Sequence, residues 1–227
     1  MLRDAGAVAS AAAALIATEA RAAIAERGRF VFAVSGGRTP WVMLRALADE
    51  DMTWNDVHIV QVDERAAPAG DSERNLTHLQ ESLLAHVPLP PSQLHAMPVE
   101  AADEETAAAS YAATLAAIAG IPPVIDLVHL GLGPDGHTAS LVPGDPVLVV
   151  TDRDVAWSGP YQGGPRMTLT FPVIDRARRI LFVVTGADKA AMLARLCRGD
   201  RTIPAGRVNA RNAIVVADAD AASALSG

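Results

Sequence analysis

Five short apolar runs, rich in β-branched residues, recur along this chain with room for a helix between most of them. They cover Phe30–Val34, Val57–Val62, Ile125–Leu130, Ile180–Val184 and Ala213–Val216. Uninterrupted apolar runs of this length are typical of strands buried on both faces, as in a parallel sheet with helices above and below it. Each run therefore predicts a strand of such a sheet.

Helical periodicity fills the segments between these runs. Four leucines between residues 76 and 84 follow the spacing of one helix face, and Asp71 or Ser72 is placed to cap that helix. Residues 106–119 and 188–196 show the same periodicity. The alternation of strands and helices predicts an α/β fold with a doubly wound, mostly parallel sheet, flanked by helices in three Rossmann-like layers.

Residues 154–171 interrupt this alternation. Two short extended pieces, Val155–Trp157 and Met167–Phe171, surround a segment rich in glycine and proline. Such a segment predicts turns, and we expect a small hairpin excursion there. No repeat or low-complexity linker divides the chain, so we expect residues 1–227 to form a single α/β domain.

Composition and charge exclude several classes of protein. The formal net charge of −7 and the lack of a lysine- and arginine-rich run argue against nucleic-acid binding. Cys197 is the single cysteine, so an internal disulfide is impossible. The alanine-rich residues 1–27 carry scattered charges, which indicates a surface helix and not a signal peptide or a membrane anchor. We expect a cytoplasmic protein, either a monomer or a homodimer.

The first candidate site is the loop that follows the first predicted strand. Ser35, Gly36, Gly37, Arg38 and Thr39 join that strand to a helix that opens near Pro40. Glycines permit close backbone approach, and the amides of a helix N-terminus attract anions. The loop could therefore be a phosphate cradle, and an ordinary tight turn explains it equally well.

The second candidate loop holds Asp63, Glu64 and Arg65 after the second strand. Two carboxylates and a guanidinium at a strand end could orient a polar substrate. A local ion pair at the surface is the interpretation that the residues by themselves favour.

The third loop, residues 131–140, carries the most chemical information. Its glycines formally match the dinucleotide fingerprint G-x-G-x-x-G, but Pro134 lies inside the turn and Pro143 follows too soon for the long helix of a nucleotide-binding unit. We therefore reject nucleotide binding. His137 stands two residues after Asp135, and a histidine can take a proton from water and return it to a leaving oxygen near neutral pH. The other five histidines have no comparable setting.

Two cations complete the set of candidates. Arg166 precedes an extended run, and Lys189 lies in the first turn of a helix that follows a strand. A cation is unfavourable beside a helix N-terminus unless an anion shares the place, although Asp188 could offset the charge of Lys189. Both an anion site and a simple local pair remain open for Lys189.

Taken in order, these segments resemble a known enzyme family. The motifs are SGGRTP (Ser35–Pro40), VDER (Val62–Arg65), GLGPDGHTASLVPG (Gly131–Gly144), RMTLTFPVID (Arg166–Asp175) and IPAGRV (Ile203–Val208). They resemble the 6-phosphogluconolactonases, which share a superfamily with the glucosamine-6-phosphate isomerases/deaminases. The resemblance implies hydrolysis of 6-phospho-D-glucono-1,5-lactone in the oxidative pentose phosphate pathway, without a metal or any other cofactor.

The resemblance also implies roles for individual residues. His137 would deprotonate the attacking water and then protonate the ring oxygen, while Asp135 would help to hold the site. The residues that the resemblance places around the substrate and its phosphate are Ser35, Gly36, Gly37, Arg38, Thr39, Asp63, Arg65, Gly133, Arg166 and Lys189.

One departure separates the two branches of the superfamily. The deaminases carry a glutamate after the histidine loop, whereas Leu141, Val142 and Pro143 offer no carboxylate at the matching place. The lactonase is therefore the favoured activity. A sugar-phosphate isomerase or deaminase, and a sensor that binds sugar phosphate without chemistry, remain the alternatives. The spacing around Asn75 also departs from the family, which leaves the role of that residue open.

Overall fold

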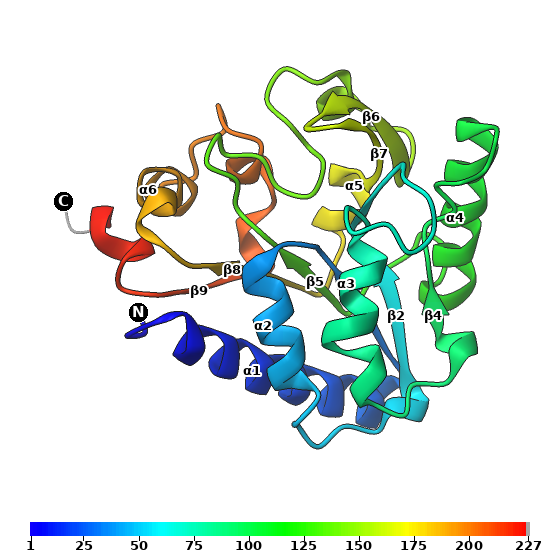
Figure 1. Ribbon diagram of the computed structural model, residues 1–227, viewed down its shortest axis with the longest axis horizontal. Coiled ribbons are helices and arrows are strands. Elements are labelled where there is room, and N and C mark those ends of the chain that lie inside the picture. Colours follow the sequence, from blue (N-terminus) through cyan, green and yellow to red (C-terminus); the bar gives the residue numbers. More distant parts are fainter. Residues whose placement is uncertain (226–227) are drawn as a thin grey trace.

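The main sheet of the protein is parallel throughout and has helices on both faces. The structure is a computed structural model that describes residues 1–225. The strand order is β4-β2-β1-β5-β8-β9, and every neighbouring pair is parallel. The strands are β1 (Phe30–Val34), β2 (Val57–Gln61), β4 (Leu94–His95), β5 (Leu127–Leu130), β8 (Arg179–Val184) and β9 (Ala213–Ala217). The predicted doubly wound α/β fold is thereby confirmed (Figure 1).

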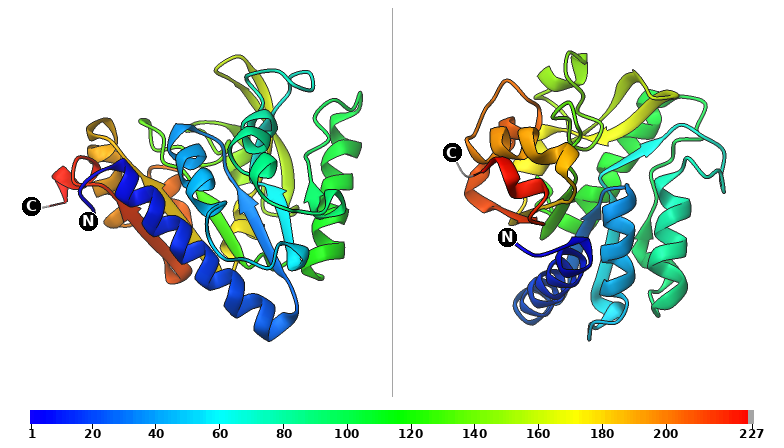
Figure 2. Two further views of the ribbon diagram at one scale, coloured as in Figure 1. Left: turned by 60° about the horizontal axis from the view of Figure 1, so that its bottom comes forward. Right: turned by 60° about the vertical axis from the view of Figure 1, so that its left-hand side comes forward.

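Side chains along one strand alternate between two apolar cores, because successive residues of a strand point to opposite faces. Phe30 and Phe32 belong to the core shared with the first three helices, whereas Val31 and Ala33 belong to the core on the other face. The helices of the first face are α1 (Ala5–Arg27), α2 (Arg38–Leu47) and α3 (Asn75–Ser82), which lie side by side in Figure 2. Those of the second face are α4 (Glu104–Ala119), α5 (Phe171–Asp175) and α6 (Ala190–Cys197).

Helix α1 is long and apolar. By length and composition it could cross a membrane, but 44% of its apolar window is buried inside the protein. Its buried residues, among them Val8 and Ile16, pack in the core of the first face. Asp4 caps its N-terminus through the amide of Ala7, and Gly28 ends it in the left-handed conformation. The helix is therefore packed as a core helix of this fold.

A second, antiparallel sheet covers part of the other face. It has the order β3-β7-β6, with β3 (Asp63–Arg65), β6 (Val155–Tyr161) and β7 (Gly164–Leu169). The predicted hairpin excursion is confirmed, but its strands run closer to the turn than the sequence indicated, and Phe171 belongs to α5. The third strand was not predicted. Residues 63–65 form it because they pair with 166–168 of β7.

One further expectation was wrong, and one strand was missed. Helix α3 begins at Asn75, so neither Asp71 nor Ser72 caps it, and the Glu64 carboxylate accepts the amide protons of Asn75 and Leu76 at its N-terminus instead. The edge strand β4 was not predicted, because two residues carry no detectable period. Short 3₁₀ turns complete the chain at Trp54–Asp56, Leu84–His86, Pro91–Gln93, Pro146–Val149, Ala187–Lys189, Ala205–Arg207, Ala210–Asn212 and Ala221–Ala224.

The topology determines where a ligand can bind. In the sheet, β1 lies between β2 and β5. The chain continues from β1 to β2 on one side and reaches β5, on the other side, only later. In open parallel sheets, ligands bind beyond the carboxyl ends of the strands at such a switch point. The loops after β1, β5 and β8 meet there.

Candidate active site

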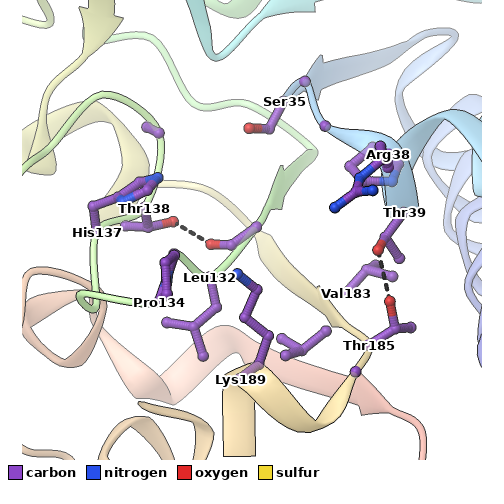
Figure 3. Close-up of a pocket in the computed structure, with 18 of the residues that line it drawn as sticks. Ser35, Arg38, Thr39, Leu132, Pro134, His137, Thr138, Val183, Thr185 and Lys189 are labelled. Atoms are coloured by element: carbon purple, nitrogen blue, oxygen red, sulfur yellow. Dashed lines mark hydrogen bonds between the residues drawn. The ribbon is translucent and has the colours of Figure 1, made fainter. Parts of the chain in front are cut away.

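A pocket of about 650 Å³ opens at the carboxyl ends of β1, β5 and β8. The loops after these strands line it, together with β3 and the turn of the β6–β7 hairpin (Figure 3). The structure thus brings nearly all the candidate residues to one cavity. Those that line it are Ser35, Gly36, Gly37, Arg38, Thr39, Asp63, Arg65, Gly133, His137, Arg166 and Lys189. Asp135 is outside this lining and contacts the His137 ring.

The loop after β1 is shaped for close approach. Gly37 precedes α2 with φ +120°, a conformation that side chains disfavour, and in the described part of the chain no side chain caps that helix. A Cβ atom on Gly36 would lie 2.0 Å from Oδ1 of Asn75, so only glycine fits against that amide. Thr39 bonds through its hydroxyl to that of Thr185 at 2.6 Å, which ties this loop to the one after β8.

Asn75 therefore belongs to the wall of this pocket. Its amide nitrogen donates to the backbone oxygen of Asp63 at 3.0 Å, and its side chain fills the space beside Gly36. The sequence could not place it, because the contact joins the start of α3 to a loop far away in the chain.

Asp63 connects three loops from beneath the pocket. It is 5% exposed, its Oδ2 accepts a hydrogen bond from the Ser140 hydroxyl at 2.7 Å, and its Oδ1 lies 3.5 Å from the Ser35 hydroxyl. Burial raises the pKa of Asp63, an effect that the hydrogen bond from Ser140 and the charge of Arg166 only partly offset. The residue braces the site as well as lining it.

Glu64 does not form the surface ion pair that the sequence favoured. Its side chain is fully buried and accepts the amide protons of Asn75 and Leu76, each at 2.8 Å, while Nε of Arg74 lies 3.2 Å away. Arg65 does form a local ion pair, but with Glu73, whose carboxylate lies 3.6 Å from the guanidinium and whose carbonyl accepts a hydrogen bond from it at 2.6 Å. The acidic motif thus fixes the start of α3, which in turn places Asn75.

His137 and Asp135 form the expected pair. Nδ1 of His137 lies 2.6 Å from Oδ1 of Asp135, and the His137 amide donates to the same oxygen at 3.1 Å. Although burial raises the pKa of Asp135, these hydrogen bonds outweigh it and hold that pKa below its usual value. An ionised carboxylate only accepts hydrogen bonds, so Nδ1 carries a proton, and in the neutral imidazole the lone pair is on Nε2.

Gly133 makes room for the imidazole ring. A Cβ atom at this position would lie 2.1 Å from Nδ1 of His137 and 2.2 Å from Cε1. The Gly133 amide donates to the His137 carbonyl at 2.8 Å, and Ala139, two residues further on, has φ +51°. The loop is closed on itself and holds the ring against its own glycine.

Two guanidinium groups face the pocket from the small sheet. Arg65 and Arg166 are directly opposite each other on β3 and β7, an arrangement that is unfavourable for like charges unless an anion joins them. Arg166 is 5% exposed, and its Nε and one Nη have no partner among residues 1–225. Burial and the charge of Arg65 lower the pKa of Arg166. Its unpaired donors are therefore available to a negatively charged ligand.

Lys189 contributes a further cation from the loop after β8, beside Arg38, Arg65 and Arg166. Its Nζ lies 3.1 Å from a carboxylate oxygen of Asp188, so the local pair that the sequence left open does form. In Figure 3 the ammonium group nevertheless points into the pocket, between the loop of His137 and that of residues 35–39. The two interpretations of Lys189 are compatible.

The remaining histidines do not reach the pocket. His129 is fully buried in β5, and burial lowers its pKa to about 3. His58 and His95 bond to each other at 3.1 Å at the edge of the main sheet, a contact that the sequence did not indicate.

The structure also reveals a site residue that sequence reasoning missed, because the Tyr161 hydroxyl lies 3.2 Å from Oδ2 of Asp135.

The site combines a hydrogen-bonded histidine–aspartate pair with a pocket lined by cations, on a parallel α/β sheet. This is the constellation of an enzyme that acts on a small anionic substrate. Within residues 1–225, no group of three or more histidine, cysteine or acidic side chains is placed to hold a metal ion.

Comparison with known proteins agrees with this class. The family described as glucosamine-6-phosphate isomerases/6-phosphogluconolactonase matches residues 3–216, and the chain belongs to that family. A 6-phosphogluconolactonase of Synechocystis is 40% identical over 185 residues, which is 80% of this chain and 77% of that protein. The 6-phosphogluconolactonase of Streptomyces coelicolor is 38% identical over 225 residues, covering 92% of this chain and 86% of the relative.

Solved structures share the whole fold. The 6-phosphogluconolactonase of Thermotoga maritima superimposes with a TM-score of 0.85 at 26% identity, over 96% of each chain. A monomeric glucosamine-6-phosphate deaminase reaches a TM-score of 0.84 at 19% identity, over 98% of this chain and 97% of its own. Lactonase and deaminase thus share one architecture, and the site residues must distinguish them.

Proposed function

We propose that this protein hydrolyses 6-phospho-D-glucono-1,5-lactone to 6-phosphogluconate in the oxidative pentose phosphate pathway, as a cytoplasmic enzyme that needs no cofactor. The observation that carries the proposal is the 2.6 Å contact between Asp135 and His137 on a pocket that also holds the unpaired guanidinium of Arg166. Family membership and the names of the relatives support the same reaction.

His137 acts as the base and then as the acid. With Nδ1 bound to Asp135, Nε2 accepts a proton from water as the water oxygen attacks C1 of the lactone. The tetrahedral intermediate carries its negative charge on the former carbonyl oxygen. The bond from C1 to the ring oxygen then breaks, and the proton on Nε2 passes to that ring oxygen. The new carboxylic acid ionises on release.

The cations and the loop after β1 hold the charged parts of the substrate. The amides of Gly36, Gly37 and Thr39 at the start of α2 suit the 6-phosphate, because an uncapped helix N-terminus attracts anions. Arg65, Arg166 and Lys189 supply positive charge to the phosphate and to the oxyanion. Such groups act most strongly where water is partly excluded.

The deaminase reaction lacks its acid here. Leu141 and Val142 follow the histidine loop as buried apolar residues, and Pro143 offers no carboxylate. Ring opening of an aminosugar would therefore have no acid at that place, which favours the lactonase.

A substrate comparison tests the proposal. Lactone disappearance is followed against spontaneous opening for 6-phosphogluconolactone and for unphosphorylated gluconolactone, with glucosamine 6-phosphate assayed separately for ammonia release. We expect rapid hydrolysis of the phosphorylated lactone alone, and a rise in KM for it in Lys189→Ala. Ammonia release from glucosamine 6-phosphate would establish the deaminase instead, and binding without turnover would indicate a sensor.

A further inference from the structure

The turn of the β6–β7 hairpin is built in an unusual way. Tyr161 pairs with Gly164 across it, so Gln162 and Gly163 form a two-residue turn in which both have positive φ, +47° and +111°. Glycine is the residue that tolerates this conformation, and a glutamine there is strained. Strain of this kind is retained where a side chain is needed, and the side chain of Gln162 lines the pocket.

A bulge aims the tyrosine next to this turn. Ser158 pairs with Arg166 and Tyr161 with Gly164, so the first strand carries one residue more than the second between these two pairs. Such bulges redirect side chains and occur beside active sites. Here the result is that the Tyr161 ring lies edge-on to the ring of His137, with the two centroids 5.3 Å apart.

The hydroxyl of Tyr161 completes the hydrogen bonding of Asp135. Oδ1 of Asp135 is used by His137, and the Tyr161 hydroxyl lies 3.2 Å from the other oxygen, Oδ2. Nε2 of Gln162 donates to the same hydroxyl at 3.2 Å. Because the ionised carboxylate of Asp135 only accepts hydrogen bonds, the Tyr161 hydroxyl donates its proton to Asp135 while it accepts from Gln162. Burial and the nearby Asp135 charge raise the pKa of Tyr161, which keeps the proton in place.

The same ring also meets a cation of the pocket. The guanidinium carbon of Arg166 lies 5.2 Å from the centroid of the Tyr161 ring, within the range of a cation–π contact. Tyr161 therefore touches the carboxylate, the imidazole and one of the cations, and no other side chain described in residues 1–225 bonds to Oδ2 of Asp135.

We propose that Tyr161 is a positioning residue for the Asp135–His137 pair. By holding Oδ2, its hydroxyl prevents rotation of the carboxylate and keeps Oδ1 on Nδ1 of His137. The imidazole then stays in one tautomer, with Nε2 free to accept a proton. The kinetic consequence rests on the proposed lactonase function, whereas the effect on the imidazole does not.

The first test removes the hydroxyl alone. Tyr161→Phe keeps the ring and its contacts, so KM should stay within about two-fold while kcat falls about five-fold, the loss that one hydrogen bond explains. When Tyr161→Phe is added to an Asp135→Asn variant, kcat should change by less than about two-fold, because the carboxylate that binds the tyrosine hydroxyl is already altered. The matched control is Tyr111→Phe, which removes the chain's other tyrosine hydroxyl from a buried site that bonds to Gln61 and His95. That variant should keep the wild-type kcat.

The second test needs no substrate. The ¹⁵N resonances of the His137 ring, assigned by their loss in His137→Gln, report its tautomer in the free protein. Wild type and Tyr111→Phe should show the Nδ1–H tautomer, and Tyr161→Phe should shift toward a mixture. Wild-type kcat and an unchanged ring spectrum in Tyr161→Phe would overturn the proposal, as would a loss confined to KM. If the ring shifts as expected but wild type fails to hydrolyse the lactone, the positioning role stands and the proposed reaction fails.

Discussion

Substituting Gly133 by alanine should displace the imidazole that we propose as the catalytic base while His137 itself is unchanged. The added Cβ would lie 2.1 Å from Nδ1 and 2.2 Å from Cε1 of His137, distances at which the ring cannot stay. The side chain of His137 is 21% exposed, so the ring can turn outward and leave the backbone in place. The substitution therefore moves a side chain and preserves the fold.

The size of the effect follows from what the ring loses. Away from Gly133 the imidazole gives up the 2.6 Å bond to Asp135 and its place beside the pocket. General base catalysis contributes about 10²–10⁴ to a rate, so kcat should fall by about that factor, equivalent to about 3–5 kcal/mol. The stability cost is smaller, about 1–2 kcal/mol for a partly exposed hydrogen bond, or a fall of about 2–8 °C in Tm.

The loop offers a matched control for this experiment. Gly131 lies two residues earlier, and a Cβ atom there would meet nothing within 4 Å. Lactone hydrolysis above the spontaneous rate is measured for Gly131→Ala and Gly133→Ala, with thermal melts for both. We expect wild-type kcat in the first and the large loss in the second. Wild-type kcat in Gly133→Ala would show that the position of His137 does not govern the reaction.

Three further substitutions test residues that line the pocket or support it. Gly36→Ala would place a Cβ 2.0 Å from the Asn75 amide, so KM for the phosphorylated lactone should rise with little change in kcat, and an unchanged KM would argue against a cradle there. Because burial raises the folded-state pKa of Asp63, its contribution to stability is present at acid pH and lost as pH rises through that value. Asp63→Asn should therefore gain stability relative to wild type in urea melts as the pH is raised above about 4, the ordinary pKa of an aspartate, and a relative loss over that rise would contradict the assignment. Glu64→Gln removes the buried counter-charge of Arg74 and leaves that guanidinium only the more exposed Glu100, 3.8 Å away, so it should lower the free energy of unfolding by about 2–4 kcal/mol; a change below about 1 kcal/mol would refute this.

The central strands and the catalytic loop could be predicted from the sequence because their signals are local. Phe30–Val34 is an unbroken apolar run, and the strand has the same bounds. Asp135 and His137 lie two residues apart in a turn, so their contact is determined largely by nearby backbone.

Contacts between distant segments could not be predicted in this way. Glu64 caps a helix that begins eleven residues later, and Asp63 bonds to Ser140 across 77 residues. Tyr161 reaches Asp135 only because a bulge turns its strand, and a bulge leaves no period in the sequence. The residues alone therefore indicate surface groups at Asp63 and Glu64 and give no signal at Tyr161, and only the family resemblance places Asp63 in the site.

The most direct test of the role of His137 is the rate at which His137→Gln hydrolyses 6-phosphogluconolactone, corrected for spontaneous opening. Glutamine fills much of the space of the imidazole but cannot accept and return a proton near neutral pH. We expect kcat to fall by about 10²–10⁴ while the protein stays folded and still binds the phosphorylated substrate. Hydrolysis by His137→Gln at the wild-type rate would contradict this role.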